Sequence, residues 1–252
     1  MQREQRRRIS KHNMRALDLP PPFRLVALRE VSDAFNHARA HAAELGAGTL
    51  VFVGRFDLAE FAVVLEPEEP LVSARRAFYA CMVALSDALA AAAPPEKPIV
   101  IEWPDAVYVD RGLIGGGRLA WPDHADERAA PDWLVFGAAI RTTFLSREES
   151  GLHPLSTALA EESFGDVSGE RLVEGFARHL MVAIDRWQEG GFTPIAKEYI
   201  SKLEPESGVG HDIGENGDLA VRRAGELTEH RHLLRALKAP SWLDPRSGGP
   251  RL

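Results

Sequence analysis

The sequence predicts an α+β fold with a mainly antiparallel sheet, and three observations lead to this prediction. Short apolar runs of strand length occur in clusters, few helical patterns separate these clusters, and glycine or proline marks many of the boundaries. Strands gathered in this way, with few helices between them, are typical of α+β proteins. We therefore expect a sheet that helices cover on one face.

The individual elements follow from local patterns. Ser32 is expected to cap a first helix that ends at Gly46, since its hydroxyl can accept an orphan backbone N–H. Apolar residues at helical spacing predict a second helix over 73–93, which Pro94 and Pro95 stop. Ser168 is expected to start a long third helix, and 228–238 reads as a terminal helix. The expected strands are 23–28, 49–53, 60–65, 99–101, 106–109, 113–121 and 133–142.

The chain divides into three parts in this prediction. Residues 1–20 are expected to form a flexible basic tail, 21–188 the main domain, and 189–252 a small C-terminal domain that contains β structure. Asn216-Gly217 favours a hairpin turn in that last part, and the chain after Pro245 is expected to be loose. The basic start is either an arm for an acidic partner or a plain tail, with Met14 as the natural start.

Composition excludes several classes of protein. The net charge of −7 argues against a general nucleic-acid binder, and no apolar run reaches the roughly 18 residues of a membrane span. The start of the chain lacks the apolar stretch of a signal peptide, so a cytoplasmic location is expected. Cys81 lies alone in an alanine-rich helical run, where a buried, inert thiol is expected rather than a nucleophile.

The stretch EWPDAVYVDRGLIGGGRLAWP, residues 102–122, carries the most information. It has the pattern of a strand, a tight turn and a second strand that contains three consecutive glycines. Glycine weakens a strand, so either another group approaches this backbone closely or the glycines permit a bulge or tight sheet packing. Both interpretations stay open at this point.

The same stretch resembles the biotin and lipoate protein ligase superfamily. Members carry a Lys-Trp-Pro-Asn-Asp hairpin, an aliphatic–Tyr–aliphatic strand, a turn and Lys-x-x-Gly. Trp103-Pro104, Val107-Tyr108-Val109 and Gly116 match this pattern without a gap. LREVSDAFNHARAHAAELGAGTLVFV, DWLVFGAAIRT, and GFTPIAKEYISKL with GENGDLAV resemble further family segments in the same order, over about 24–222. The resemblance implies a mixed, mainly antiparallel sheet with helices and a small C-terminal β domain.

The departures from the family pattern concern the catalytic residues. Leu113 occupies the position of the family's catalytic lysine, which holds the acyl carboxylate and the α-phosphate as the acyl-adenylate forms. Glu102 replaces the lysine before the tryptophan, and Asp105-Ala106 replaces the Asn-Asp pair. The arginine-rich loop is reduced to residues 54–57, and Arg141 replaces an asparagine. The resemblance thus implies a kept scaffold that has lost most adenylation residues, and leaves the catalytic residue unknown.

The resemblance also selects candidate ligand-binding residues, because the family's second hairpin strand lines the acyl pocket. An arginine can clamp a carboxylate or phosphate with two parallel hydrogen bonds, although each arginine alone also fits a surface position. Asp105 is either a functional carboxylate or an ordinary turn residue. The candidates are Arg55, Trp103, Asp105, Gly115, Gly116, Gly117, Arg118 and Arg141.

Two classes of function remain open. One is an enzyme that transfers an acyl group to a lysine of a biotinyl or lipoyl carrier domain, with ATP and biotin, lipoate or octanoate as implied ligands. The other is a non-catalytic descendant that binds a small carboxylic acid or a protein. A monomer and a homodimer are both open. No bound metal is expected, because His37 and His41 have the spacing of a zinc pair but no evident third ligand.

Overall fold

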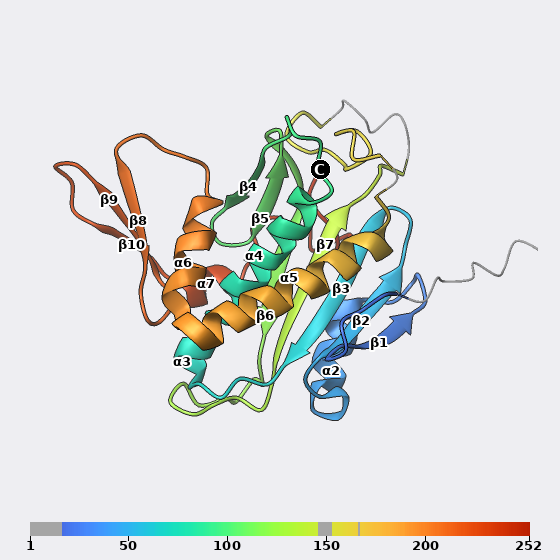
Figure 1. The fold of residues 1–252 in the computed structure, drawn as a ribbon, viewed down its shortest axis with the longest axis horizontal. Coiled ribbons are helices and arrows are strands. Elements are labelled where there is room, and N and C mark those ends of the chain that lie inside the picture. The colour runs from blue at the N-terminus through green and yellow to red at the C-terminus, as the bar shows by residue number, and fades with distance from the viewer. Residues whose placement is uncertain (1–16, 146–152, 166) are drawn as a thin grey trace, which may run out of the picture.

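The computed structural model describes residues 17–145, 153–165 and 167–252 (Figure 1). Most of the predicted basic tail, residues 1–16, lies outside the described residues. Within them, a seven-stranded sheet has the order β1-β2-β3-β7-β6-β5-β4, and a three-stranded sheet has the order β10-β9-β8. The predicted α+β class is confirmed.

The predicted elements recur with small shifts at their ends. The strands of the large sheet are β1 (Arg24–Leu28), β2 (Thr49–Gly54), β3 (Leu58–Leu65), β4 (Ile99–Glu102), β5 (Ala106–Val109), β6 (Gly112–Ala120) and β7 (Leu134–Arg141). The small sheet contains β8 (Val209–Ile213), β9 (Leu219–Arg223) and β10 (Glu229–Arg231). The helices are α2 (Ala34–Leu45), α3 (Leu71–Ala74), α4 (Ala77–Ala90), α5 (Gly169–Gly190), α6 (Phe192–Ser201) and α7 (Leu233–Leu237).

Strand direction follows the prediction of a mainly antiparallel, mixed sheet. β1 and β2 pair in parallel, with Arg24 opposite Thr49, because α2 carries the chain back between them. The other described pairs of the large sheet are antiparallel. The hairpin β5–β6 and its neighbour β7 therefore bring the glycine-rich strand into the middle of the sheet.

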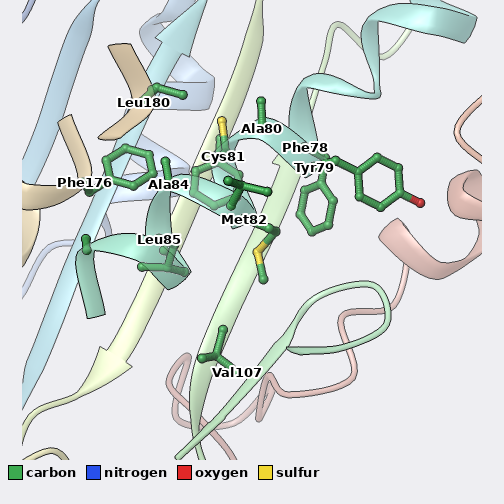
Figure 2. Close-up of a cluster of buried hydrophobic side chains, with 14 of the residues drawn as sticks. Phe78, Tyr79, Ala80, Cys81, Met82, Ala84, Leu85, Val107, Phe176 and Leu180 are labelled. Atoms are coloured by element: carbon green, nitrogen blue, oxygen red, sulfur yellow. The ribbon is translucent and has the colours of Figure 1, made fainter. Parts of the chain in front are cut away.

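One face of the large sheet packs against α4, α5 and α6. Phe61 and Phe136 from the sheet meet Phe176 of α5, with ring centroids 4.6 and 5.7 Å apart. Figure 2 shows α4 in this layer, with Cys81 among apolar side chains. Burial raises the pKa of the Cys81 thiol, which fits the inert thiol expected from the sequence.

The other face of the sheet is also covered, so the expectation of one covered face is wrong. α2 packs over β2, β3 and β7, with Phe35 and Ala38 buried against Val135. Asp33, not the predicted Ser32, caps α2, because its carboxylate accepts the N–H of Asn36. The remainder of this face lies under the C-terminal segment, which passes on the side of the sheet opposite α4 and α5 (Figure 1).

The small sheet is tied to the main body through a chain of hydrogen bonds. The indole N–H of Trp103 donates to the hydroxyl of Tyr79 at 3.0 Å, and that hydroxyl donates to the carbonyl of Gly217 at 2.6 Å. The predicted hairpin turn at Asn216-Gly217 therefore docks on α4. The division of the chain at residue 188 stays a prediction, and α5 continues two residues past it to Gly190.

Three local predictions need correction. The expected helix over 73–93 is split into α3 and α4 by a tight turn, in which Phe78 and Tyr79 bond to carbonyls three residues back. The expected helix over 228–238 begins as β10, because pairing with β9 prevails over local helix preference. The chain after Pro245 is not loose, since Leu243 pairs with Pro250 and Arg251 donates to the Trp242 carbonyl.

Candidate functional site

A bulge in β6 determines which of its side chains share a face. Tyr108 lies opposite Leu113, but Val107 lies opposite Gly115, so β6 contains one residue more than β5 at this point. The bulge needs glycine at 115, where φ is 149° and a Cβ atom would lie 1.9 Å from the Ala139 carbonyl oxygen. As a result Leu113 and Gly116 face the same side of the sheet, away from α4.

Small side chains on this face form a shallow floor, which we call the glycine slot. Its members are Ala106, Leu113, Gly116 and Ala139. Gly117 lies outside the floor, since its missing side chain leaves room for Met82 and Phe136 on the opposite face. Of the three predicted glycines, the structure therefore places only Gly116 in the slot.

The indole of Trp242 fills the glycine slot. Trp242 is 1% exposed, and its N–H donates to the carbonyl oxygen of Gly117 at 2.9 Å. A Cβ atom on Gly116 would lie 2.5 Å from the Trp242 ring. The flat group that lies against the glycine backbone is thus a side chain of the same protein.

Asp105 holds the C-terminal segment beside the slot. Both of its carboxylate oxygens accept hydrogen bonds from Ser241, one from the hydroxyl at 2.7 Å and one from the backbone N–H at 3.0 Å. Burial raises the pKa of Asp105 to about 6, and the two bonds from Ser241 oppose this shift by stabilising the charged form. Asp105 therefore stabilises the position of Ser241 and Trp242.

Arg141 anchors the same segment further along. Its side chain is buried and donates to the carbonyl oxygens of Pro250 and Arg251 at 2.7 and 3.0 Å. Another nitrogen donates to the Thr157 carbonyl at 3.2 Å. Residues 240–251, which we call the C-terminal strap, are thus held at both ends by predicted site residues.

The other two predicted arginines lie near a second cluster, centred on carboxylates. Arg55 binds Asp57 with two hydrogen bonds of 3.0 and 2.7 Å and approaches Glu60 at 3.6 Å. Arg118 pairs with Asp33 at 3.1 Å. Burial raises the pKa of Glu60, which also accepts the first N–H of α2. Arg55 and Arg118 thus face these carboxylates, whereas Arg141 faces the strap.

An open pocket of about 520 Å³ lies beside the slot, and we call it the side pocket. The end of β6, the first turns of α2, the helix α7 and the strap form its walls. Arg118 lies on one side, with its guanidinium 4.1 Å from the centre of the Phe35 ring. Lys238 lies on the other side, and its side chain has no partner in the described part of the chain. The remaining walls combine the charged residues Arg39, Asp123 and Glu127 with apolar side chains, among them Leu119, Trp121, Leu234, Leu237 and Leu243.

Comparison with known proteins identifies the family to which this fold belongs. The sequence profile of the Biotin/lipoate A/B protein ligase family matches residues 19–201. The chain belongs to the biotin/lipoate A/B protein ligase family. No curated protein sequence matches it.

Solved structures of family members agree with this assignment. A biotin protein ligase-like protein of unknown function from Silicibacter sp. TM1040 is 30% identical, with a TM-score of 0.74 over 88% of this chain and 99% of that one. The biotin protein ligase of Aquifex aeolicus shares the fold at 17% identity, with a TM-score of 0.65 over 83% and 95% of the two chains. That ligase has also been solved in complex with biotin and ATP, with a TM-score of 0.62.

The glycine slot of this family member is apolar and filled. Leu113, at the position of the family lysine, is 7% exposed and forms an apolar wall against Trp242.

In the described residues no cluster of His, Cys, Asp or Glu is suited to a metal ion. His37 and His41 stack on each other at the surface, 4.5 Å between centroids. No described helix is long and apolar enough to cross a membrane.

Three residues of this region escaped the sequence analysis: Glu60, Lys238 and Trp242. Glu60 left a local signal, because it is a charged residue inside the otherwise apolar strand LAEFAVVL. Trp242 left only a weak one, as an aromatic residue within a segment rich in proline and glycine. Trp103, which the sequence did select, points to Tyr79 and supports the docking of the small sheet.

Proposed function

We propose that this protein binds a small carboxylic acid in the side pocket and does not activate it. The observation that carries the proposal is the contrast between the two hollows of the site. The glycine slot contains Trp242 and a leucine at the lysine position, whereas the neighbouring pocket is open and combines cations with apolar side chains. Such a pocket suits an apolar chain or ring that ends in a carboxylate.

Lys238 and Arg118 supply the charge complement for the acid. Lys238 lacks a partner in the described part of the chain, so an incoming carboxylate does not have to displace one. Arg118 pairs with a single oxygen of Asp33, and a guanidinium has five N–H donors, so donors remain for a ligand. Asp123 and Glu127 also line the pocket, but each is paired with an arginine, Asp123 with Arg39 and Glu127 with Arg75, so neither leaves an uncompensated negative charge there.

The family relationship supports the chemical class of the ligand. A structure of the Aquifex aeolicus ligase contains biotin, which is a ring system with a carboxylated chain. Biotin, lipoate and octanoate are therefore the acids to test, and a cytoplasmic location suits all three. Ligation is not expected, because a buried leucine cannot bind the carboxylate and the nucleotide phosphate together.

Calorimetric titration of octanoate, lipoate and biotin tests the proposal. We expect at least one acid to bind. Arg118→Gln and Lys238→Gln should each lower the affinity for this acid about tenfold or more, as the loss of a charged hydrogen bond implies. Arg178→Gln is the matched control, since it removes a partly exposed arginine whose partner, Asp18, lies elsewhere. If none of the acids binds the folded protein, or both variants bind like the control, the proposal is wrong.

A second arm separates binding from ligation. The protein is incubated with each acid, ATP and a biotinyl or lipoyl carrier domain, and release of pyrophosphate and acylation of the carrier lysine are measured. We expect neither product. Formation of an acyl-adenylate would show that the protein is an enzyme, and the non-catalytic function would then be rejected even if the acid bound in the side pocket.

A further inference from the structure

A second cleft lies between the small C-terminal sheet and α3, and its volume is about 530 Å³. We call it the module cleft. Its walls come from the main body on one side and from the β8–β9 turn and α7 on the other. The polar side chains that line it are Arg75, Asn216, Asp218, His232, Arg235 and Lys238. We propose that this cleft binds a phosphate group, either free or as part of a nucleotide.

Arg75 is the buried member of this set. Two of its nitrogens donate to Glu127 at 2.8 and 2.6 Å, and its guanidinium lies 5.4 Å from the centre of the Trp121 ring. Its side chain is 4% exposed, and the Nε donor is buried without a hydrogen-bond partner. Because this nitrogen is buried, it does not face the open cleft, and Arg75 contributes to the wall a guanidinium that Glu127 already partners.

Two further cations line the cleft. The side chains of Arg235 and Lys238 have no partner in the described part of the chain, and both are exposed. Arginine is well suited to phosphate because its fork of donors matches two phosphate oxygens, and lysine adds a point charge. These two side chains with Arg75 give the cleft three cationic groups from two separate parts of the fold.

The one carboxylate of the described lining is already engaged. Asp218 accepts from the N–H of Leu233 at 2.9 Å, from the amide of Asn216 at 2.9 Å, and lies 2.8 Å from Nδ1 of His232. Burial alone would raise the pKa of Asp218, but these hydrogen bonds, with that of His232 foremost, lower it, so its charge is offset by its own neighbours. Holding Nδ1 also leaves Nε2 of His232 available to a ligand.

The module cleft and the side pocket are separable. They share Leu234 of α7 and Lys238 directly after it, but Arg235 and His232 line only the cleft, and Arg118 and Arg39 line only the side pocket. Variants at these positions therefore distinguish the two sites. Failure of phosphate binding leaves the carboxylic-acid proposal untouched, and the reverse also holds.

Calorimetric titration of inorganic phosphate, ATP and adenosine into the full chain tests the inference. We expect phosphate and ATP to bind and adenosine not to bind, since it lacks the phosphate. ATP binding more tightly than phosphate would identify a nucleotide as the source of the group, and equal affinities would identify the free anion. Adenosine binding as tightly as ATP, or no binding of phosphate and ATP, would overturn the proposal.

Charge variants locate the site. Arg235→Gln should lower the affinity for phosphate at least fivefold. Arg235→Lys should retain most of this affinity, because it keeps a cation at the position. Arg222→Gln is the matched control, since it removes an arginine of the small sheet whose side chain is 62% exposed and pairs with Asp212 outside the cleft. If Arg235→Gln and Arg222→Gln lose the same phosphate affinity, with folding confirmed by circular dichroism, the protein attracts phosphate only through its general surface charge. That result would overturn the proposed site. Loss of phosphate binding in Arg118→Gln but not in Arg235→Gln would assign the anion to the side pocket and would overturn the proposal.

Discussion

The indole nitrogen of Trp242 lies 2.9 Å from the carbonyl oxygen of Gly117, and this hydrogen bond joins residues 125 positions apart in the chain. The bond satisfies a backbone acceptor in the buried middle of the sheet, and the indole ring covers the glycine next to it. In this protein the surface on which a family ligand is expected is therefore part of the folded core.

Removal of the indole should create a cavity that other rings can enter. Trp242→Ala is expected to lower the free energy of unfolding by about 3–5 kcal/mol, the cost of deleting a buried aromatic side chain. Because the cavity has apolar walls, added indole should bind in it and restore part of the loss. Urea unfolding with and without indole measures both effects. Trp133→Ala, in which a half-buried tryptophan is removed from another place, should show no rescue.

The stability of the protein should depend on pH through Asp105. Its pKa of about 6 in the folded state lies above the ordinary value of 3.8, so between these values the folded protein binds more protons than the unfolded chain. The contribution of Asp105 is therefore largest below about pH 4, falls as the pH rises to about 6, and is constant above it. The loss amounts to roughly 3 kcal/mol for a shift of about two units.

Comparison with Asp105→Asn isolates this contribution. The variant cannot titrate at this position, so its stability should change less between pH 4 and pH 6.5 than that of the wild type. Unfolding in urea at five pH values gives the two slopes. Identical slopes would mean that the carboxyl group is not the origin of the pH dependence.

A side chain at position 116 should disrupt the core and not only the slot. In Gly116→Val the new Cβ atom would lie 2.0 Å from the Asp105 carbonyl oxygen as well as 2.5 Å from the Trp242 ring. Backbone cannot yield as a flexible side chain does, so we expect a loss of about 3 kcal/mol or more. Gly210→Val in β8 is the control, because its nearest neighbours lie 3.9 Å away. Thermal unfolding of both variants provides the measurement.

Restoring the family lysine should not restore ligation. In Leu113→Lys an ammonium group would replace a side chain that packs against Ala106, Ala139 and Trp242. Burial of an unpaired charge is costly, so the variant should be less stable by several kcal/mol, and the pKa of the lysine should fall. Leu113→Met, which conserves volume, should cost less than about 1.5 kcal/mol. Pyrophosphate release with biotin and ATP above that of wild type would contradict the expectation.

Local sequence patterns were sufficient to predict most strands of the large sheet. Strands such as β3 and β7 are apolar runs bounded by turn residues, and Ser168 caps α5 as its hydroxyl predicts. Tertiary contacts decided the elements that were missed. Residues 229–231 are helical by local preference, but β9 offers an unpaired edge, and the ladder it forms with them prevails.

In the candidate site, too, local sequence patterns predicted some features and tertiary contacts decided the others. The sequence correctly marked residues 115–117 as a place where groups approach closely, since glycine weakens a strand and is favoured there where a neighbouring group needs the space. It had no means of naming the group, because the partner of Gly116 is set by a contact far along the chain. Asp105 and Arg141 were selected as ligand-binding candidates, and in the structure both hold the strap. The sequence alone could not show that Asp105 and Arg141 bind the strap, because these contacts depend on where the strap lies in the folded protein.

The strap also sets an order of events during synthesis. Chains are made from the N-terminus, and domains begin to fold as they emerge. The floor of the glycine slot is complete in the chain at Ala139, long before the ribosome reaches Trp242. A nascent chain whose sheet has formed therefore exposes an empty apolar slot and an unmet Gly117 carbonyl until the indole arrives. During that interval the slot is open to chaperones and to flat small molecules that the finished protein excludes.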